Sequence, residues 1–240
     1  MTLPLSGPLS LNDIRVELGA SSTNVSLGTM SDTAGFTAPD KVSDFYGFSA
    51  VPTGLTSAIY TENLSSSNSW SLVQEDISTI YNGKTCKLVI HYTNGTASTS
   101  FRGDFQVGAN ISFGPSDISF ASSTTGWETT RANVAGTKNA YDAATFFTLA
   151  DGTTSGRWNR RNTSAPPSGG TGLVPDTSVT GTQYYAYTET SGASSTMLGY
   201  GFFFRSPSVT LDAESNSFEI AIAHFGSNVG SFSVFLDVIS

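Results

Sequence analysis

The chain has 240 residues, of which only 12% are charged, and its formal net charge is −8. This charge argues against a nucleic-acid-binding function, because phosphate binding needs clustered lysine and arginine, and the single cysteine excludes an intrachain disulfide framework. Abundant Gly, Ser and Thr, together with 12% aromatic residues, favour short strands and turns over helices, which predicts an all-β fold. No stretch is long and apolar enough to span a bilayer, and the first residues lack the basic and apolar regions of a signal peptide, so we expect no membrane insertion.

The first fifty residues contain the helical signals of the chain. Ser10 and Asp13 have the spacing of a capping box, and Gly19 is placed to end the helix that follows. After a polar stretch, a second short helix is predicted over residues 39–46. Helices this short are not stable alone, so we expect residues 1–50 to be a docking segment that packs on another surface. The apolar residues expected to make this docking surface are Leu11, Ile14, Leu18, Leu27, Val42, Phe45 and Tyr46.

Three motifs occur in a fixed order in this segment. They are Pro8-Leu-Ser-Leu-Asn-Asp-Ile-Arg-Val-Glu-Leu-Gly19, Val25-Ser-Leu-Gly28 and Val42-Ser-Asp-Phe-Tyr-Gly47. Together, over residues 4–48, they resemble a segment that recurs in structural proteins of tailed bacteriophages. The resemblance implies a virion protein that is made in the cytoplasm of a host bacterium. The alternative interpretation is an ordinary N-terminal helical subdomain.

From residue 51 onward the sequence indicates strands and turns. Strands are predicted at residues 55–60, 70–73, 86–92, 101–107, 110–113, 118–120, 143–149, 156–160, 183–189, 198–205 and 209–211. Residues 121–140 and 164–172, which are rich in small, polar or Pro residues, are expected to be loops. We therefore expect residues 51–240 to form one β-sandwich.

The last 25 residues predict two apolar strands joined as a hairpin by a turn at residues 226–230. Alternation places large apolar residues and His224 on one face, while the opposite faces also carry Ala221, Ala223 and Phe235. Strands without a fully polar side are expected in the middle of a sheet, covered on both surfaces. Such strands also suggest a subunit interface, so we expect a homo-oligomer, with a trimer as the expected form because phage fibres and spikes are often trimeric.

A second set of motifs lies in residues 157–238. These motifs are Trp158-x-Arg160, Ala165-Pro-Pro-Ser-Gly-Gly-Thr-Gly172, Asp176-Thr-Ser-Val-Thr-Gly181, Tyr184-Tyr-Ala-Tyr-Thr-Glu189, Ser206-Pro207 and residues 224–236. In that order they resemble a MAM domain, a module related to the concanavalin-type lectin fold, which implies an antiparallel jelly-roll β-sandwich. The cysteines of that family are missing, and Thr177 stands where the family has a histidine. For this reason the family's adhesion role is not carried over.

The order of these motifs implies a circular permutation of the MAM-like domain. Residues 70–73, 87–90, 103–107 and 111–113 resemble the later strands of the family, although here they come first. A permutation is physically cheap where domain termini lie close together. It predicts that residues 88–92 and 218–224 share one sandwich and that residues 51–55 lie beside Val238.

Catalysis has little support in the sequence. Both histidines lie within apolar strands, and there is no Gly-x-Ser-x-Gly elbow and no Cys and His spacing typical of a metal site. Cys86 is expected to be a small buried hydrophobe. The carboxylates that concanavalin-type glycosidases carry on alternate residues of one strand are also missing from the predicted strands. We therefore expect no enzyme and no catalytic residues, and a glycan-degrading depolymerase of the virion is the alternative.

Two weaker binding features remain. Asp176 matches an acidic position that MAM-type domains keep near a cation site, so a structural calcium ion is one interpretation, with Glu189 and loop carbonyls as further oxygen ligands. The other is that Asp176 caps a turn through its side chain. The second feature is a set of aromatic residues near predicted loops, Trp127, Trp158, Tyr184 and Tyr185. One interpretation is that their rings stack on a host surface glycan, and the other is that they belong to the core or to a subunit interface.

The sequence thus predicts a structural component of a tailed-phage virion. Its N-terminal segment is expected to dock on other virion proteins. Its lectin-like sandwich is expected to serve adhesion on a tail or fibre, or to act as a capsid decoration.

Overall fold

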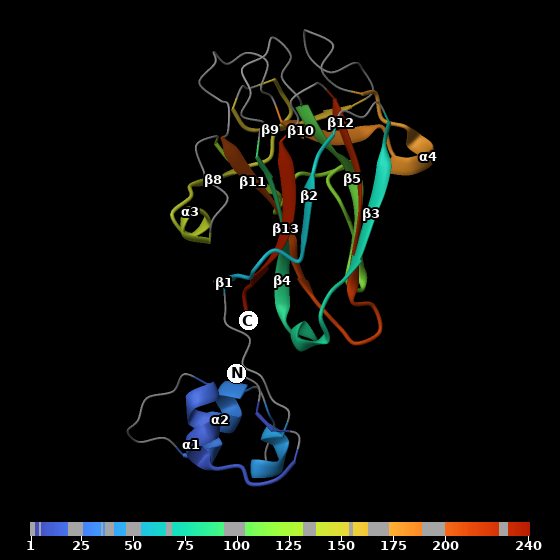
Figure 1. Ribbon diagram of the computed structural model, residues 1–240. Helices are drawn as coiled ribbons and strands as arrows, with labels where there is room; N and C mark the ends of the chain where they lie inside the picture. The colour runs from blue at the N-terminus through green and yellow to red at the C-terminus, as the bar shows by residue number, and fades with distance from the viewer. Residues whose placement is uncertain are drawn as a thin grey trace. The chain divides into compact units, whose positions relative to one another are not determined.

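The chain divides into two compact units, Met1–Pro52 and Thr53–Ser240, which we call the N-terminal unit and the sandwich unit. The computed structural model describes residues 3–4, 6–18, 26–34, 36, 41–46, 54–65, 69–93, 104–131, 138–153, 156–162, 173–188, 200–225 and 230–240. Figure 1 shows short helices in the first unit and two layers of strands in the second. No helix among these residues has the length and apolar character needed to cross a membrane.

The N-terminal unit contains three short helical elements. They are α1 (Leu11–Glu17), α2 (Leu27–Ala34) and the 3₁₀ turn η1 (Val42–Phe45). The predicted capping box is confirmed, because the Asp13 amide donates to Ser10 Oγ at 3.1 Å and the Ser10 amide donates to Asp13 Oδ2 at 2.9 Å. Within the second predicted helix, at residues 39–46, the structure has the single turn η1, and residues 39 and 40 lie outside the described residues. No helix is predicted at α2, whose apolar content is low and whose buried residues are Met30 and Ser31.

The helices of this unit pack on one another. Leu3, Ile14, Met30 and Phe45 are buried together in one cluster, in which the rings of Phe36 and Phe45 meet edge to face at 5.0 Å. This burial explains how elements too short to be stable alone hold a defined structure.

The sandwich unit is an antiparallel jelly-roll β-sandwich, which confirms the predicted fold class. Within the described residues, the first sheet has seven strands in the order β1-β13-β4-β11-β7-β8, with β2 also paired to β13, and the second has six in the order β3-β12-β5-β10-β9, with β6 paired to β5. The first sheet comprises β1 (Gly54–Leu55), β2 (Tyr60–Asn63), β4 (Thr85–Thr93), β7 (Glu128–Thr130), β8 (Phe146–Thr148), β11 (Gly201–Thr210) and β13 (Ser231–Val238). The second comprises β3 (Ser71–Asp76), β5 (Asp104–Phe113), β6 (Ser116–Ser119), β9 (Trp158–Asn162), β10 (Tyr184–Thr188) and β12 (Ser217–Phe225). The chain passes repeatedly from one sheet to the other, as a jelly roll requires.

Several predicted boundaries changed in the folded chain. Residues 121–140, expected to be loop, contain β7 and the start of the helix α3 (Lys138–Asp142), because Thr129 and Thr130 find strand partners in β8 that no local pattern reveals. The strands β5 and β11 each join two ranges that were predicted as separate strands. Two further short helical elements are η2 (Thr79–Tyr81) and α4 (Thr177–Thr180).

The predicted hairpin of the last two strands is wrong. The strand β12 pairs with β3 and β5 in the second sheet, whereas β13 pairs with β1, β2 and β4 in the first. The inner faces of β12 and β13 are apolar except for His224, and they are buried most completely when they belong to opposing layers of one core. Both strands do lie mid-sheet, as predicted, and residues 226–229 of the expected turn lie outside the described residues.

Both placements that follow from the predicted permutation are confirmed. The strand β4 and the strand β12 lie in the two sheets of the same unit. Gly54 pairs with Val238 and Leu55 with Asp237, so the start and the end of the sandwich unit lie side by side (Figure 1). Residues 51–53 of the predicted neighbourhood fall outside the described part of the chain.

The core between the sheets is dominated by aromatic rings. Phe105 of β5 stacks on Tyr92 of β4 at 5.1 Å and on Phe232 of β13 at 4.9 Å, which joins the two layers. The Trp158 ring, which is 0% exposed, stacks on Phe204 at 5.2 Å. Each such ring contributes large buried apolar area and an additional geometric preference.

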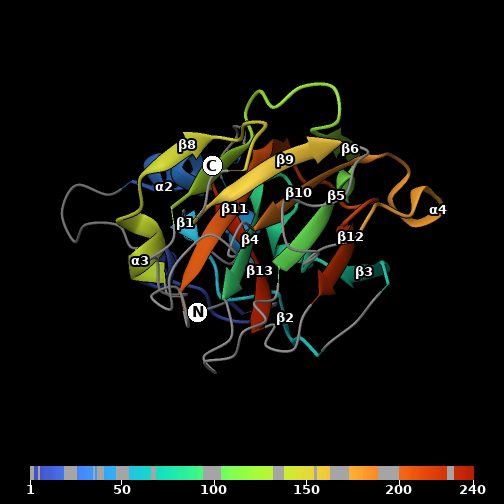
Figure 2. The same cartoon turned by 90° about the horizontal axis from the view of Figure 1, so that it is seen from above.

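Smaller apolar clusters cover the outer face of each sheet. On the first sheet, Tyr141 of α3 packs with Val89 and Phe203, and on the second, Trp70 packs with Tyr185 and Ala221. Figure 2 shows α3 and α4 on opposite sides of the sandwich. The apolar outer faces that led us to expect an oligomer are thus covered, at least in part, by segments of the same chain.

Replacing Trp158 by alanine should destabilise the sandwich unit by about 3–5 kcal/mol, because a large ring is removed from a filled core. Chemical denaturation followed by circular dichroism measures this change. The matched control is Tyr200→Ala, whose ring is 39% exposed and whose loss should change stability by less than about 0.5 kcal/mol. Equal stability of the two variants would contradict the buried position of Trp158.

Candidate functional site

The predicted docking residues divide into buried and exposed groups. Ile14 and Phe45 are 0% exposed within the core of the N-terminal unit, and Leu18, Leu27 and Val42 pack against that core. Leu11 is 48% exposed and Tyr46 is 37% exposed. Val16, which was not among the predicted docking residues, is 51% exposed. The exposed apolar surface of this unit is therefore smaller than predicted.

Most of the predicted glycan-contact aromatics do not reach the surface. Trp127, Trp158 and Tyr185 are at most 2% exposed and belong to the core or to the outer cluster of the second sheet, so they have no free face for a sugar ring. Trp158 of β9 points into the core, Tyr185 of β10 lies in the outer cluster with Trp70, and Trp127 immediately precedes β7 and stacks on Phe204. The sequence alone could not separate these buried positions from a surface role. Tyr184 is half-buried and lies 5.2 Å from the guanidinium of Arg160.

The alternative interpretation of Asp176 as a turn cap is confirmed. Asp176 is the N-cap of α4, and its Oδ1 accepts from the amide of Ser178 at 3.0 Å and from the Ser178 hydroxyl at 2.6 Å. These hydrogen bonds lower the pKa of the Asp176 carboxyl. Glu189 lies outside the described residues, and among those residues no group of three or more His, Cys, Asp or Glu side chains is arranged to hold a metal.

The cysteine and both histidines are buried. Cys86 is 0% exposed, and burial raises the pKa of its thiol to about 11, so it is the small buried hydrophobe that was predicted. His91 packs on Phe203 with ring centroids 4.5 Å apart. His224 is 7% exposed, its Nδ1 has no hydrogen-bond partner, and burial lowers its pKa.

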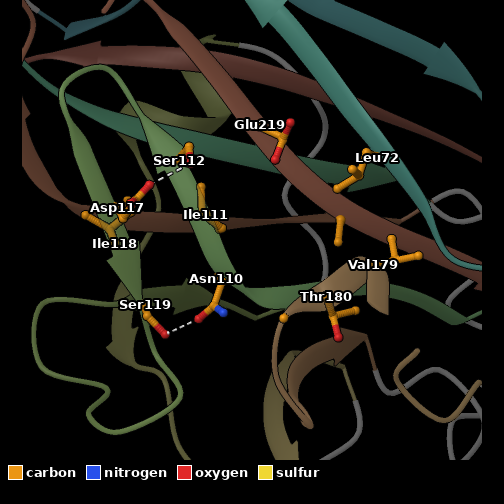
Figure 3. Close-up of a pocket in the computed structure, with 12 residues that line it drawn as sticks. Leu72, Asn110, Ile111, Ser112, Asp117, Ile118, Ser119, Val179, Thr180 and Glu219 are labelled. Carbon is orange, nitrogen blue, oxygen red and sulfur yellow. Dashed lines mark hydrogen bonds between the residues drawn. The ribbon is translucent and has the colours of Figure 1, made fainter. Parts of the chain in front are cut away.

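The strongest candidate for a binding site is a groove on the outer face of the second sheet, which we call the outer-face groove. Its volume is about 430 Å³, and it lies over β12 and the β5–β6 hairpin, with β3 and α4 at its sides (Figure 3). None of its lining residues was predicted as a site residue. Its sequence signal is the alternation of Asn110 with Ser112 and of Asp117 with Ser119 on either side of the turn at Gly114, which places four polar side chains on one face.

A row of polar residues crosses four strands at this groove. Gln74 pairs with Glu219, Glu219 with Ser112, and Ser112 with Asp117, so the four side chains share the outer face. With neighbouring strands about 4.8 Å apart, the row spans about 14 Å. The backbone groups between these strands are engaged in the sheet ladder, which leaves recognition to side chains.

Hydrogen bonds fix the side chains of the hairpin. The Ser112 hydroxyl donates to Asp117 Oδ1 at 2.7 Å, and the Ser119 hydroxyl donates to Asn110 Oδ1 at 2.9 Å (Figure 3). Gly181, at φ 65°, ends α4 beside Asn110, where a Cβ atom would lie 2.8 Å from Asn110 Nδ2. A glycine is therefore favoured here both by the left-handed backbone and by the approach of the amide.

One wall of the groove is a segment that is fastened to the sheet. Gln106, 0% exposed, donates from Nε2 to the carbonyl of Leu173 at 2.8 Å and accepts from the amide of Leu173. The Trp70 indole donates to the carbonyl of Val174 at 2.9 Å. Farther along the segment, Thr180 lies close to Gly108, where a Cβ atom would meet the Thr180 side chain at 3.4 Å. These contacts set the position of α4 beside the groove.

The groove combines acidic, neutral polar and apolar surface. Asp117 is exposed and Glu219 half-buried, and none of the lining residues is Lys, Arg or His. Leu72, 52% exposed, and Val179 provide apolar surface at the sides. The groove therefore suits a ligand without strong negative charge.

Two other polar clusters are occupied by internal contacts. Under α3, Glu128 accepts from Arg205 at 2.7 Å and from Lys87 at 2.9 Å, and the Tyr141 hydroxyl donates to Asp237 at 2.6 Å. The bond from Tyr141 to Asp237 ties α3 to the first sheet, and the bonds of Glu128 join strands within that sheet. In a hollow of about 300 Å³ beside β9, Arg160 is held by Asp151 and also donates to the carbonyl of Phe120 at 2.8 Å.

Comparison of the chain with protein-family models, with curated proteins and with solved structures found no match. The two resemblances seen in the sequence therefore remain predictions.

Replacing Gln106 by alanine should release the wall of the groove. The amide and carbonyl of Leu173 would lose their buried partners, which costs about 1–3 kcal/mol locally. Hydrogen exchange should become faster over residues 173–181. The exposed Gln74 supplies the control, since Gln74→Ala should leave exchange in this segment unchanged.

Stability should fall in mild acid because of His224. Its ordinary pKa is 6.5 and burial lowers it in the fold, so below about pH 6.5 the unfolded chain binds the proton first and is favoured. The free energy of unfolding should fall by up to about 1.4 kcal/mol for each pH unit until the pH passes the pKa of His224 in the folded state. Denaturation of the wild type and of His224→Phe at several pH values measures it. The difference between the two curves should grow from pH 7 towards about pH 5, and parallel curves would refute the assignment.

Proposed function

We propose that this protein is a structural component of a tailed-phage virion. Its N-terminal unit docks on other virion proteins, and its sandwich unit is displayed on the particle for adhesion from the tail or a fibre. Support comes from the three N-terminal motifs that resemble phage structural proteins and from the division of the chain at residue 52, which separates those motifs from the sandwich.

The observation that carries the proposal is that the motif-bearing residues form a compact unit with its own core. In that unit the core takes up Ile14 and Phe45 and leaves Leu11 and Val16 on the surface. A small unit with exposed aliphatic side chains is suited to contact another protein, because such side chains gain free energy when an interface covers them.

The display role is favoured over capsid decoration by the outer-face groove. A decoration protein needs only surfaces that contact the capsid, whereas an adhesin needs a site that faces outward. A groove formed by rigid strands and a fastened wall meets that requirement.

Changing the exposed aliphatic residues of the N-terminal unit should prevent assembly into particles. In the phage that encodes the chain, Leu11→Asp and Val16→Asp should each lower the amount of protein in purified particles about tenfold or more, since an unpaired carboxylate buried at an interface costs more than about 1.4 kcal/mol. Deletion of residues 1–52 should abolish incorporation while the sandwich unit still folds. Quantitative mass spectrometry of the particles measures both.

The matched control is Ile80→Asp, which places the same charge on a residue of the sandwich unit that is 50% exposed. This variant should enter particles as the wild type does. Normal incorporation of the deletion variant, or absence of the wild-type protein from purified particles, would overturn the proposal.

A further inference from the structure

We propose that the outer-face groove binds a neutral, hydroxyl-rich saccharide chain laid across β3, β12, β5 and β6. The inference rests on the proposed function, since an adhesin displayed on a particle requires a ligand on the host surface. It names the site and the chemical class of that ligand, and it uses residues of the sandwich unit alone.

The dimensions of the groove fit a chain of sugar rings. A volume of about 430 Å³ lies within the range of about 300–1,000 Å³ that is usual for sites of small organic ligands. Within the lining of the groove the polar row from Glu219 to Asp117 extends about 10 Å, which is longer than one sugar ring, and Gln74 continues the row onto β3 beyond the lining. An extended, open site of this kind favours an oligosaccharide over a single compact molecule.

The polar groups match the donors and acceptors of sugar hydroxyls. The carboxylates of Glu219 and Asp117 accept hydrogen bonds from hydroxyl groups, and the Asn110 amide both donates and accepts. The hydroxyl hydrogen of Ser112 is already used within the hairpin, so its oxygen faces a ligand as a fixed acceptor, whereas Ser119 Oγ donates to Asn110 and accepts from the Ala121 amide and serves to hold Asn110 in place. Groups held in place before binding lose less entropy when the ligand arrives.

The apolar sides of the groove fit the same ligand class. Leu72 and Val179 border the polar row from β3 and α4 (Figure 3), and Ala221 of β12 also lines the groove. A pyranose ring presents C–H groups on its faces and hydroxyls around its edge. A site that alternates aliphatic surface with hydrogen-bonding groups can therefore contact both.

Other ligand classes fit less well. Anionic glycans and phosphates would meet two carboxylates and no cationic lining residue. A divalent cation needs several converging oxygens, whereas Asp117 and Glu219 lie on strands separated by β5, with Cα atoms about 10 Å apart. An extended peptide that adds a strand would pair with the outer edge of β3 or β6 and would not lie over the groove, because the backbone groups between the four strands of the row belong to the ladder.

The test is a titration of the ¹⁵N-labelled full chain followed by amide chemical shifts. The probes are short oligomers of glucose, galactose, mannose and N-acetylglucosamine, with oligogalacturonate and calcium chloride alone as comparisons. At least one neutral oligomer should shift amides of β6, β12 and α4 at millimolar concentration. Glu219→Gln and Asp117→Asn should each weaken that binding about tenfold, since hydrogen bonds to charged groups are the stronger kind.

Two further variants make the result specific to the groove. Ser119→Trp, at an exposed position of β6, should fill the groove and abolish binding without unfolding the protein. Glu214→Gln removes the same charge as Glu219→Gln from an exposed loop residue and should bind as the wild type does. Thermal unfolding of each variant verifies that the fold is intact.

Several results would overturn the inference. They are an absence of shifts with every neutral oligomer, shifts that map outside the groove, binding of oligogalacturonate alone, and the same shifts with calcium chloride alone. The groove variants should enter particles normally, so loss of saccharide binding leaves the virion proposal standing. Failure of the wild type to appear in particles, with saccharide binding intact, would refute the virion proposal and not the groove.

Discussion

The mutual burial of two apolar strand faces across the sandwich is the constraint on which the rest of the structure depends. The inner faces of β12 and β13, the last two strands, belong to opposite sheets, and aromatic rings such as Phe105 and Phe232 close the space between them. Two sheets in contact exclude water from both inner surfaces at once, which a hairpin within one sheet cannot do. The pairing of β1 with β13 then brings both ends of the sandwich unit to one edge of the first sheet.

The apolar outer faces of the sheets must also be covered, and polar residues hold part of that cover in place. Buried Gln106 takes the place of a strand neighbour for the backbone of Leu173, so a segment without a ladder of its own can lie on the sheet. Small residues permit the same approach, because Gly108 leaves room for Thr180. The cost of burying a glutamine side chain is offset because both of its polar ends are bonded.

The outer-face groove owes its shape to this arrangement. The strands supply a rigid floor and a polar row in fixed register, while the fastened segment supplies a wall. Sites carried by strands hold their side chains more accurately than sites carried by loops. In the proposed virion protein, attachment and recognition would therefore be assigned to separate units. Exposed aliphatic residues in the N-terminal unit would serve attachment, and polar side chains on the second sheet would serve recognition.

The sequence by itself determined the all-β class, the capping box of Ser10, most strands and the burial of Cys86, because these depend on local spacing and composition. It also indicated where the two ends of the sandwich unit lie. Tertiary structure alone decided that β12 and β13 face each other, that Trp158 and Tyr185 are buried, and that Glu219 joins Ser112 and Asp117 in one row. Alternation states that a residue lies on one of two faces, but the partner strands decide which face is covered. These partners can lie more than a hundred residues away in the chain, as for Glu219 and Ser112, so no local pattern contains them.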